Sequence, residues 1–395
     1  MPWKNENMND VRKEFVQKAL REGANLSALC REYHVTRKTG REWRERAKHQ
    51  GIDFLAEKSR RPAKSPNRLE EEVICHLIRL KLAYPHWGPK KLCHERFHKS
   101  GEAPSISSCH RILNKAGLVQ RKKKRVKQNP RIILSAEKPL GPNDVWTVDF
   151  KGWWHLANGE RSEPLTVRDA FSRFVLAASL LKDARTAALK KEFGRLFYLY
   201  GLPKVIKSDN GTPFASVNGV MGLSQLSAWW VSLGIILERS RPAHPQDNGA
   251  HERLHKDIEE QIAAKTQHNA RTQQVALDLW REEFNHQRPH EMLAGRCPAQ
   301  VYRKSTRKFS NDQTILDYGT GFFPRKVDTS GGLKWNGCRI FISQAIAGWN
   351  VGLRVLANET LAVWLNYLLL GSIDLKTNHF VSAPSRSAKT VRLAA

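Results

Sequence analysis

The sequence of 395 residues has no Cys-x-x-Cys pair among its six cysteines and no apolar run of about 18 residues. The first absence argues against a zinc ribbon and against a disulfide framework, so we expect free thiols. The second leaves no candidate for a membrane-spanning helix. The N-terminus also lacks the charged and then apolar segments of an export signal. We therefore expect a cytoplasmic protein with no membrane partner.

Acidic residues are scarce, with 38 Asp and Glu against 66 Lys and Arg, which gives a net charge of +28. Residues 1–140 alone hold 33 Lys and Arg against 15 Asp and Glu, so the front third is the most basic part. Such an excess raises the affinity for polyanions through counterion release. DNA is the leading expected partner, and an anionic membrane surface is the lesser alternative. The length predicts two to four domains.

The front of the chain has the pattern of a helix-turn-helix unit, predicted over residues 1–57. The expected helices cover residues 11–22, 27–33 and 36–49. Thr36 or Ser27 can cap the helix that it precedes. The third helix is strongly basic, which is typical of a recognition helix, although a solvated basic face is the alternative. The DNA contacts predicted on it are Arg37, Lys38, Arg41 and Arg44.

A basic linker at 58–67 leads to a second helix-turn-helix domain, predicted over 68–120. Its helices are expected at 69–82, from Trp87 onward, and from a capping Ser105 to the Gly117 turn. The DNA contacts predicted in it are Lys90, Lys91 and Arg111. A second basic linker, 121–142, follows, and its like charges resist folding unless an anion neutralises them. We expect a linker that follows DNA rather than a nuclear signal, with contacts from Arg121, Lys122, Lys123, Lys124 and Arg125.

Residues 143–305 alternate between strand and helix signals. The expected strands cover 145–150, 165–167, 174–180, 204–207 and 235–238, and the expected helices cover 186–200, 224–233 and 250–265. Strands that first follow one another and then alternate with helices indicate an α/β domain with a mixed sheet. Beyond it, short β runs with Gly turns predict a small β-barrel-like domain over 315–380. The polar, basic tail 381–395 is predicted to be disordered.

Three acidic residues in the α/β segment are candidates for a metal site. Asp149 ends a strand pattern, Asp209 follows another strand in an Asp-Asn-Gly turn, and Glu252 lies in the first turn of a helix. Each also has an ordinary explanation, as an edge-strand polar residue, a turn residue and a favourable charge at a helix N-terminus. The rival acids are Asp169, Glu238 and Asp247, interpreted as a turn, a strand end and a helix cap.

Two aspartates and a glutamate suit phosphodiester chemistry. Carboxylates are ligands that Mg²⁺ accepts, and two such ions about 4 Å apart activate the attacking oxygen and support the leaving one. The sequence shows no phosphate-binding Gly-x-x-x-x-Gly-Lys loop and no Ser or Cys nucleophile motif that would indicate another mechanism. The helix that carries Glu252 is expected to bury Leu254, Ile258 and Ile262, which leaves Glu252, His255 and Lys256 on another face. There Lys256 forms either a surface ion pair or a contact to DNA.

Four blocks of this segment resemble the retroviral-integrase-type core of bacterial insertion-sequence transposases. They are Trp146-Thr-Val-Asp-Phe-Lys-Gly, Lys207-Ser-Asp-Asn-Gly-Thr-Pro-Phe, Arg241-Pro-Ala-His-Pro-Gln-Asp-Asn-Gly-Ala-His-Glu-Arg-Leu-His-Lys, and Phe284-Asn-His-Gln-Arg-Pro-His-Glu-Met-Leu with Cys297-Pro-Ala-Gln-Val-Tyr. The front segments Lys58-Ser-Arg-Arg-Pro and Trp87-Gly-Pro-Lys-Lys-Leu are similar to the doubled helix-turn-helix of one such family. The sequence departs from the family pattern at Phe284 and Cys297, where the family has Tyr and Thr, and in a longer spacing between Asp209 and Glu252.

The resemblance implies a ribonuclease H-like fold in which Asp149, Asp209 and Glu252 are the catalytic metal ligands of a DDE-type enzyme. It also implies two Mg²⁺ ions, with Mn²⁺ as a substitute, and a transposase that binds terminal inverted repeats, frees 3′-OH ends and joins them to target DNA. Pairing of two ends implies at least a dimer, working at the bacterial nucleoid. The alternatives are a DNA-binding regulator with an inactive core and a structure-specific nuclease that does not join strands.

Overall fold

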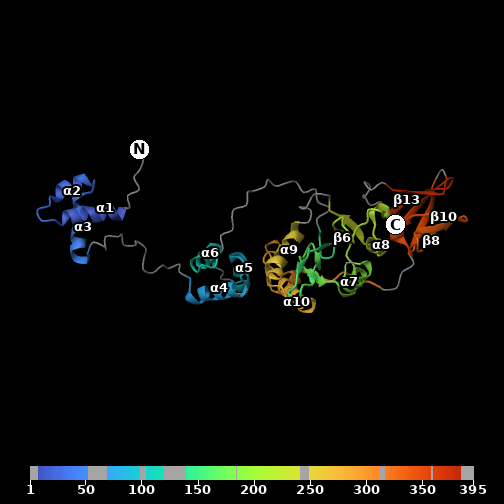
Figure 1. Ribbon diagram of the computed structural model, residues 1–395, viewed down its shortest axis with the longest axis horizontal. Helices are drawn as coiled ribbons and strands as arrows, with labels where there is room; N and C mark the ends of the chain where they lie inside the picture. The colour runs from blue at the N-terminus through green and yellow to red at the C-terminus, as the bar shows by residue number, and fades with distance from the viewer. Residues whose placement is uncertain are drawn as a thin grey trace. The chain divides into compact units, whose positions relative to one another are not determined.

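The computed structural model describes residues 8–51, 69–97, 104–119, 139–183, 185–240, 249–310, 316–356 and 359–383. Backbone contacts divide the chain into two units, Met1–Glu70 and Glu71–Ala395, which Figure 1 colours in chain order. The linker contacts Arg121 to Arg125, the rival acid Asp247 and most of the tail lie outside the described residues. No helix within the described ranges is long and apolar enough to cross a membrane.

The first unit contains three helices, α1 (Met8–Ala19), α2 (Leu26–Glu32) and α3 (Arg37–Gln50). Thr36 caps α3 as expected, because its side chain accepts a hydrogen bond from the Thr39 amide. The cap predicted at Ser27 is wrong, since Asn25 caps α2 by accepting from two amides. The helices pack around Phe15, and a Cβ on Gly40 of α3 would lie only 2.5 Å from the Cys30 sulfur. Such close packing of α2 and α3 is a helix-turn-helix arrangement.

The second unit begins with another three helices, α4 (Glu71–Ala83), α5 (Pro89–Phe97) and α6 (Ile106–Lys115). They share a small apolar core of their own, which includes Leu77, Trp87 and Leu113. Ser105 caps α6, as its sequence position predicts. These helices therefore have the expected positions and an independent core.

A five-stranded sheet, in the order β5-β4-β1-β6-β7, forms the centre of the next domain. The strands are β1 (Val145–Phe150), β4 (Pro164–Asp169), β5 (Val175–Leu180), β6 (Val205–Ser208) and β7 (Ile236–Arg239). β4 pairs antiparallel with β1 and with β5, whereas β6 runs parallel to β1 and to β7. This order and these directions confirm the predicted ribonuclease H-like core.

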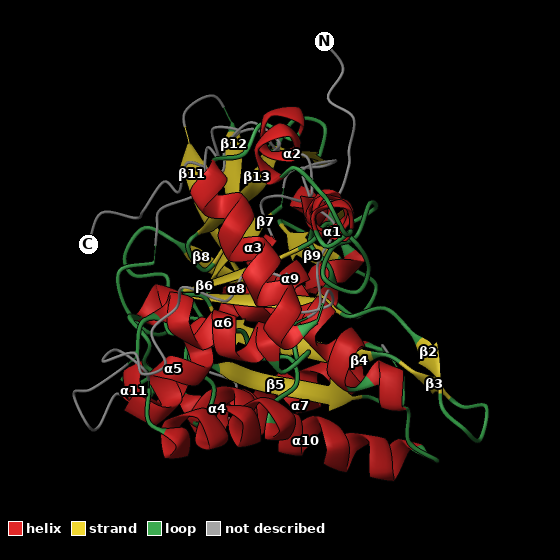
Figure 2. Cartoon of the chain, turned by 90° about the vertical axis from the view of Figure 1, so that its left-hand side faces the viewer, coloured by secondary structure: helices red, strands yellow, loops and turns green. Residues whose placement is uncertain are grey.

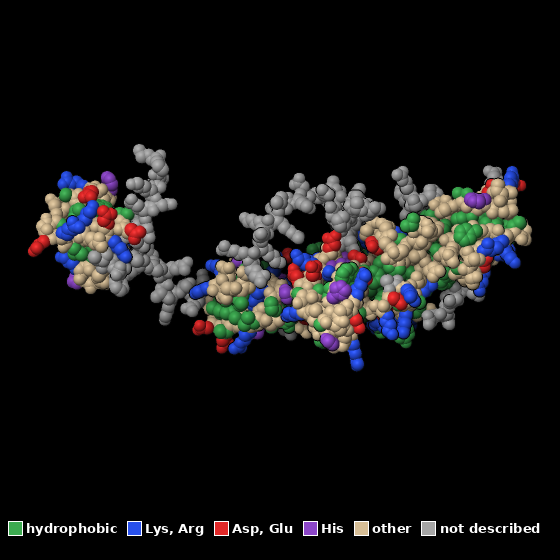
Figure 3. All heavy atoms as spheres, viewed as in Figure 1, with side chains coloured by type: hydrophobic (Ala, Val, Ile, Leu, Met, Phe, Trp, Pro, Cys, Tyr) green, Lys and Arg blue, Asp and Glu red, His purple; other side chains and the backbone are tan. Residues whose placement is uncertain are grey.

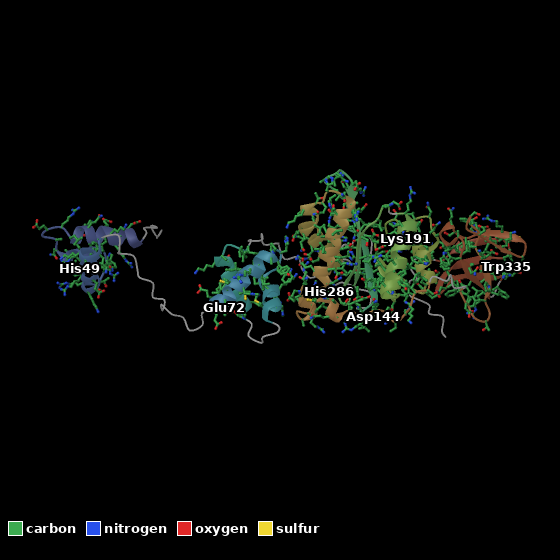
Figure 4. The ribbon with its side chains drawn as sticks, turned by 90° about the horizontal axis from the view of Figure 1, so that it is seen from below. His49, Glu72, Asp144, Lys191, His286 and Trp335 are labelled. Atoms are coloured by element: carbon green, nitrogen blue, oxygen red, sulfur yellow. The ribbon has the colours of Figure 1, made fainter. Side chains whose placement is uncertain are left out.

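Helices cover both faces of this sheet (Figure 1). Phe193 and Phe197 of α7 (Thr186–Tyr200) and Trp230 of α8 (Gln225–Ser232) pack on one face, against Trp146. On the other face, α9 (Gly249–Gln261) and α10 (Ala270–His286) pack on β5 in a separate cluster. Figure 4 labels His286 on α10 and Lys191 on α7, with Asp144, which directly precedes β1, between them.

Helix α10, which was not predicted, runs along the edge strand β5 (Figure 2). Its Asn285 side chain accepts a hydrogen bond from the Val175 amide and donates one to the Val175 carbonyl. Gln274 accepts from the amide of Leu180 in the same way, at 2.7 Å. The open edge of the sheet is thereby covered by side-chain amides, which prevents pairing with another strand.

Short elements complete the core. They are the hairpin of β2 (Trp154–His155) and β3 (Arg161–Ser162), the 3-10 turns Val220–Gly222, Ala263–Lys265 and Glu291–Leu293, and α11 (Pro298–Val301). The helix expected over 250–265 thus ends at Gln261 and continues as a 3-10 turn. Figure 2 shows the β2-β3 hairpin extending beyond the end of the main sheet.

The C-terminal region is an all-β domain, and its apolar core includes Val220, Leu223, Ala228 and Val231 of the catalytic domain. Its strands are β8 (Phe323–Lys326), β9 (Gly332–Trp335), β10 (Cys338–Phe341), β11 (Asn350–Leu356), β12 (Thr360–Leu365), β13 (Leu368–Asp374) and β14 (His379–Ser382). They form a five-stranded sheet, β14-β13-β12-β11-β8, and a separate β9-β10 hairpin. Within the described strands the hydrogen-bonded sheet stays open, so closure into a barrel is not confirmed.

Candidate active site

Asp149 is the next-to-last residue of β1, and its side chain is half-buried. Burial, and then the charges of Asp209 and Glu252, raise the pKa of Asp149 to about 6. Burial raises the pKa of a carboxyl group because the charged form loses hydration, and nearby carboxylates raise it further. Asp209 and Glu252, which are far from Asp149 in sequence, therefore both lie within electrostatic reach of it.

Asp209 directly follows β6, which is parallel to β1, so both acids lie toward the same edge of the sheet. The adjacent Asn210 donates a hydrogen bond of 2.7 Å to the Ser240 carbonyl and so fastens this turn to the end of β7. A Cβ on Gly211 would lie 2.9 Å from a carboxylate oxygen of Asp209. Glycine at this position thus leaves room for the exposed Asp209 carboxylate.

Glu252 lies exposed in the first turn of α9. With His255, Lys256, Glu259 and Glu260 it lines a shallow surface depression of about 440 Å³. Lys256 is exposed and forms an ion pair of 3.8 Å with Glu260. No three His, Cys, Asp or Glu side chains in the described ranges are gathered tightly enough to hold one metal ion. The three acids are close, but they do not form a finished coordination shell.

A buried hydrogen-bond network lies between α9 and the sheet, directly beside Asp149. The Thr166 hydroxyl donates to the Asp149 carbonyl at 2.9 Å and lies 2.6 Å from Nε2 of His251 and 2.9 Å from Nε2 of His255. Nδ1 of His251 lies 2.9 Å from the Thr147 hydroxyl. Burial lowers the pKa of His251 well below its ordinary value and that of His255 to about 4. Both imidazoles are therefore neutral at pH 7.

This network was not predicted from the sequence. The apolar side of α9 follows the expected spacing, with Leu254 and Ile258 buried. His255 was placed on the opposite, exposed face with Glu252, whereas it is half-buried and bonded to the sheet. The four-residue spacing of His251 and His255 could have indicated that both contact the sheet, because residues four apart lie on the same face of a helix.

The two rival acids in the described residues have structural roles. Asp169 is buried and accepts hydrogen bonds from the amides of Asn143 and Ser172 and from the Ser172 hydroxyl. Glu238 pairs with Lys207 across neighbouring strands at 2.8 Å. Both interpretations, as a turn and as a strand-end residue, agree with these contacts.

The basic residues predicted to bind DNA differ in their surroundings. Arg37, Lys38 and Arg41 are exposed on α3, whereas Arg44 is half-buried and lies 3.7 Å from Glu45. Figure 3 shows Lys and Arg side chains mixed with acidic ones on the surface of the first unit. Arg111 is exposed on α6 and donates to the Ser108 hydroxyl.

The second pair of predicted contacts, Lys90 and Lys91, lies against the integrase-like segment in this structure. Lys90 forms an ion pair with Glu291. Burial, and then the neighbouring Arg288, lower the pKa of Lys91 to about 8. Tyr84, directly after α4, also donates a hydrogen bond to Gln287. Both lysines thus have contacts with protein that phosphate groups would have to replace.

The fourth sequence block serves the fold. Its Asn285 covers the edge of β5, and its Arg288 forms an ion pair of 2.8 Å with Asp257 of α9. Only 3% of Arg288 and 4% of Asp257 are exposed, so this pair is shielded from water. It fixes the helix that carries Glu252 to the end of α10.

Family models match both halves of the chain. A model described as an integrase core domain matches residues 139–245, and a second with the same description matches residues 233–298. At the front, a helix-turn-helix domain model matches residues 11–63, and a homeodomain-like domain model matches residues 39–113. The integrase matches together span the sheet and all three acidic residues.

The chain is 26% identical over 249 residues to a 31.7 kDa protein of insertion element IS407 from Burkholderia multivorans, covering 60% of this chain and 83% of that protein. It is 25% identical over 264 residues to a 39.2 kDa protein of insertion element IS476 from Xanthomonas euvesicatoria, covering 66% and 72% respectively. A solved HTLV-2 integrase catalytic core domain in complex with magnesium is 18% identical and covers 42% of this chain and 99% of its own, with a TM-score of 0.33.

The fold and the family matches define an integrase-core enzyme, a polynucleotidyl transferase of the transposase and integrase class. Helix-turn-helix domains lie ahead of that core, and the similar proteins are encoded by insertion elements, which supports the resemblance to bacterial insertion-sequence transposases.

Proposed function

We propose that this transposase binds the terminal inverted repeats of its own element, hydrolyses one strand at each end to leave a 3′-OH, and uses that oxygen to attack target DNA. The observation that carries the proposal is the convergence of three acids: the parallel pairing of β1 and β6 brings Asp149 and Asp209 to the same edge of the sheet, and both Asp209 and Glu252 act on the charge of Asp149. Burial, and then these two neighbouring charges, raise the pKa of Asp149, and a bound cation favours the charged form of such a carboxylate.

The donor set fits Mg²⁺, since carboxylate oxygens are its preferred protein ligands and few are needed when phosphate and water complete the shell. Asp149, Asp209 and Glu252 would hold two ions, for which Mn²⁺ is a substitute. Bound there, the ions supply activation of the attacking oxygen and neutralise charge on the phosphate. Burial, and then the charges of Asp209 and Glu252, raise the pKa of Asp149, and cations held by the three acids would offset those charges.

The side chains of the site have different roles in binding the ions and the DNA. Asp149 is held rigidly by a strand in the middle of the sheet, whereas Asp209 and Glu252 are exposed and can adjust to an incoming phosphate. Lys256, one turn after Glu252 on the same helix, is placed to contact the DNA backbone once it leaves its ion pair with Glu260.

The basic front of the chain holds the DNA ends. Arg37, Lys38 and Arg41 on α3 are free to enter a major groove, and Arg111 marks the corresponding surface of α6. Residues 121–125 would follow the phosphate backbone toward the catalytic domain. Binding of two ends requires at least a dimer, working at the bacterial nucleoid.

The experiment is a cleavage and joining assay on a DNA fragment that carries the repeats flanking the coding region. In Mg²⁺, Asp149→Asn, Asp209→Asn and Glu252→Gln should each abolish both reactions, because an amide keeps the shape and removes the ligand charge. Binding of the repeat in a gel shift should persist. Glu238→Gln is the matched control, since its carboxylate pairs with Lys207 and should be dispensable for chemistry.

Each remaining outcome contradicts part of the proposal. Normal product from one of the three variants removes that residue from the site. Cleavage without joining by the unmodified protein identifies a nuclease, and repeat binding without cleavage identifies a regulator with an inactive core.

A further inference from the structure

The face of the sheet beneath the start of α9 is unusually polar. In the antiparallel register of β1 and β4, Asp149 pairs with Thr166 and Thr147 pairs with Arg168. Directly opposed residues point to the same face of a sheet, so these four side chains form one patch. The apolar contacts of α9 lie further along, at Leu254, Ile258 and Ile262. The Glu252 end of the helix is therefore attached to the sheet by polar contacts.

His251 makes that attachment, and its ring bridges two strands. Its Nε2 lies 2.6 Å from Thr166 on β4, and its Nδ1 lies 2.9 Å from Thr147 on β1. One turn later, Nε2 of His255 reaches the same Thr166 hydroxyl at 2.9 Å. His251 is fully buried, so these hydrogen bonds do not compete with water.

The Thr166 hydroxyl uses its full hydrogen-bonding capacity. Its hydrogen goes to the Asp149 carbonyl at 2.9 Å, so its two lone pairs remain for the two imidazole N–H groups. Both rings then carry a hydrogen on Nε2. On the other side of the His251 ring, Nδ1 lies 2.9 Å from the Thr147 hydroxyl, which itself donates to the Arg168 carbonyl at 3.3 Å.

We propose that Thr166, His251 and His255 are positioning residues that set the separation between Asp149 and Glu252. Thr166 holds the backbone of Asp149, and His251 is the residue next to Glu252. The Thr166 hydroxyl thus links the Asp149 carbonyl to His251 through two hydrogen bonds, and the contact of His251 with Thr147 gives a second link to β1. This inference rests on the proposed function, because it takes both acids to be ligands of the same metal site.

The test uses the full chain and Mn²⁺ as the probe, with free Mn²⁺ followed by electron paramagnetic resonance in the absence of DNA. Thr166→Val keeps the shape of the side chain and removes the hydroxyl, and it should weaken Mn²⁺ binding about tenfold, the lower range for residues that support a metal ligand. Thr166→Ser restores the hydroxyl and should return binding to within about threefold of the unmodified protein. Cleavage should follow the same order, with a raised Mg²⁺ requirement.

Thr266→Val is the matched control. Its hydroxyl donates to the His155 carbonyl at the exposed base of the β2-β3 hairpin, so its loss should leave Mn²⁺ affinity unchanged. If Thr166→Val does not fold, His255→Leu replaces it, since that ring is half-buried and its removal leaves the bond of His251 to Thr166 in place. His255→Leu should weaken Mn²⁺ binding by about threefold or more.

Unchanged Mn²⁺ affinity in a folded Thr166→Val or His255→Leu protein overturns the proposal and leaves the network a purely structural one. Asp149→Asn, measured alongside, separates this failure from a failure of the proposed function. If Asp149→Asn loses Mn²⁺ binding and cleavage while both network variants keep them, only the positioning role is wrong. If Asp149→Asn keeps both, the metal site itself is wrong.

Discussion

Replacing Asp149 with Asn should stabilise the metal-free catalytic domain, although the residue is proposed to be essential. The pKa of Asp149 rises from 3.8 to about 6 on folding, first because of burial and then because of Asp209 and Glu252. Below pH 3.8 the carboxyl is protonated in both states and has no effect. Between 3.8 and 6 the folded state keeps a proton that the unfolded chain has lost, so stability falls as the pH rises. Above pH 6 the carboxylate is charged in both states, and the full loss of folding stability is present.

The size of this penalty follows from the two pKa values. The rise from 3.8 to about 6 corresponds to about 3 kcal/mol at neutral pH. The side chain is only half-buried, and solvent screening reduces the figure, so we expect a gain of roughly 1 to 2 kcal/mol for Asp149→Asn. In a domain of this size that gain raises the midpoint of thermal unfolding by roughly 2 to 8 °C.

The assay is thermal unfolding of the full chain, followed by the fluorescence of tryptophans such as Trp146 and Trp230, which are fully buried in the catalytic domain. In EDTA at about pH 7.5 Asp149→Asn should melt above the unmodified protein, and at about pH 4 the difference should vanish. Excess Mg²⁺ should reverse the order, because only the unmodified protein gains stability by binding it.

Asp169→Asn is the control for a buried carboxylate with a structural role. Both oxygens of Asp169 accept hydrogen bonds, from Asn143 and from Ser172, so an amide should destabilise the domain with or without Mg²⁺. The reasoning about repulsion is refuted if Asp149→Asn lowers the metal-free midpoint at about pH 7.5, or if Mg²⁺ stabilises both proteins equally.

Three further predictions concern other parts of the molecule. Gly211→Ala should displace the Asp209 carboxylate and reduce cleavage, while circular dichroism shows that the fold is intact. Full cleavage activity would show that the turn accepts the extra methyl group without moving the carboxylate. Asp257→Asn should cost about 3 to 5 kcal/mol of core stability in urea unfolding by leaving Arg288 buried without its partner, and a loss below 1 kcal/mol would contradict this. Residues 1–135 alone should bind a terminal repeat in preference to random DNA, with log affinity falling by about 0.9 per phosphate contact for each tenfold rise in salt. Equal affinity in a gel-shift competition would make these domains non-specific clamps.

The sequence alone predicted the elements whose signals are local. The strand of Val145–Phe150 and the helix of Thr186–Tyr200 begin and end where they were expected, because apolar periodicity and flanking turn residues specify them. Thr36 and Ser105 were recognised as caps, since a cap depends on a few neighbouring residues. Asp149, Asp209 and Glu252 could be chosen as candidates because strand ends and helix starts are visible in the sequence.

The tertiary structure alone decided how distant segments meet. Nothing local predicted that α10 would cover the edge of β5 with Asn285 and Gln274, or that Arg288 would pair with Asp257. The hydrogen bonds of His251 and His255 to Thr166 join residues 85 and 89 positions apart. Local patterns specify which face of an element is apolar, but a polar residue finds its partner only when the sheet register and the helix rotation are both fixed. That is why the acids of the candidate site were found in the sequence and the network that supports them was not.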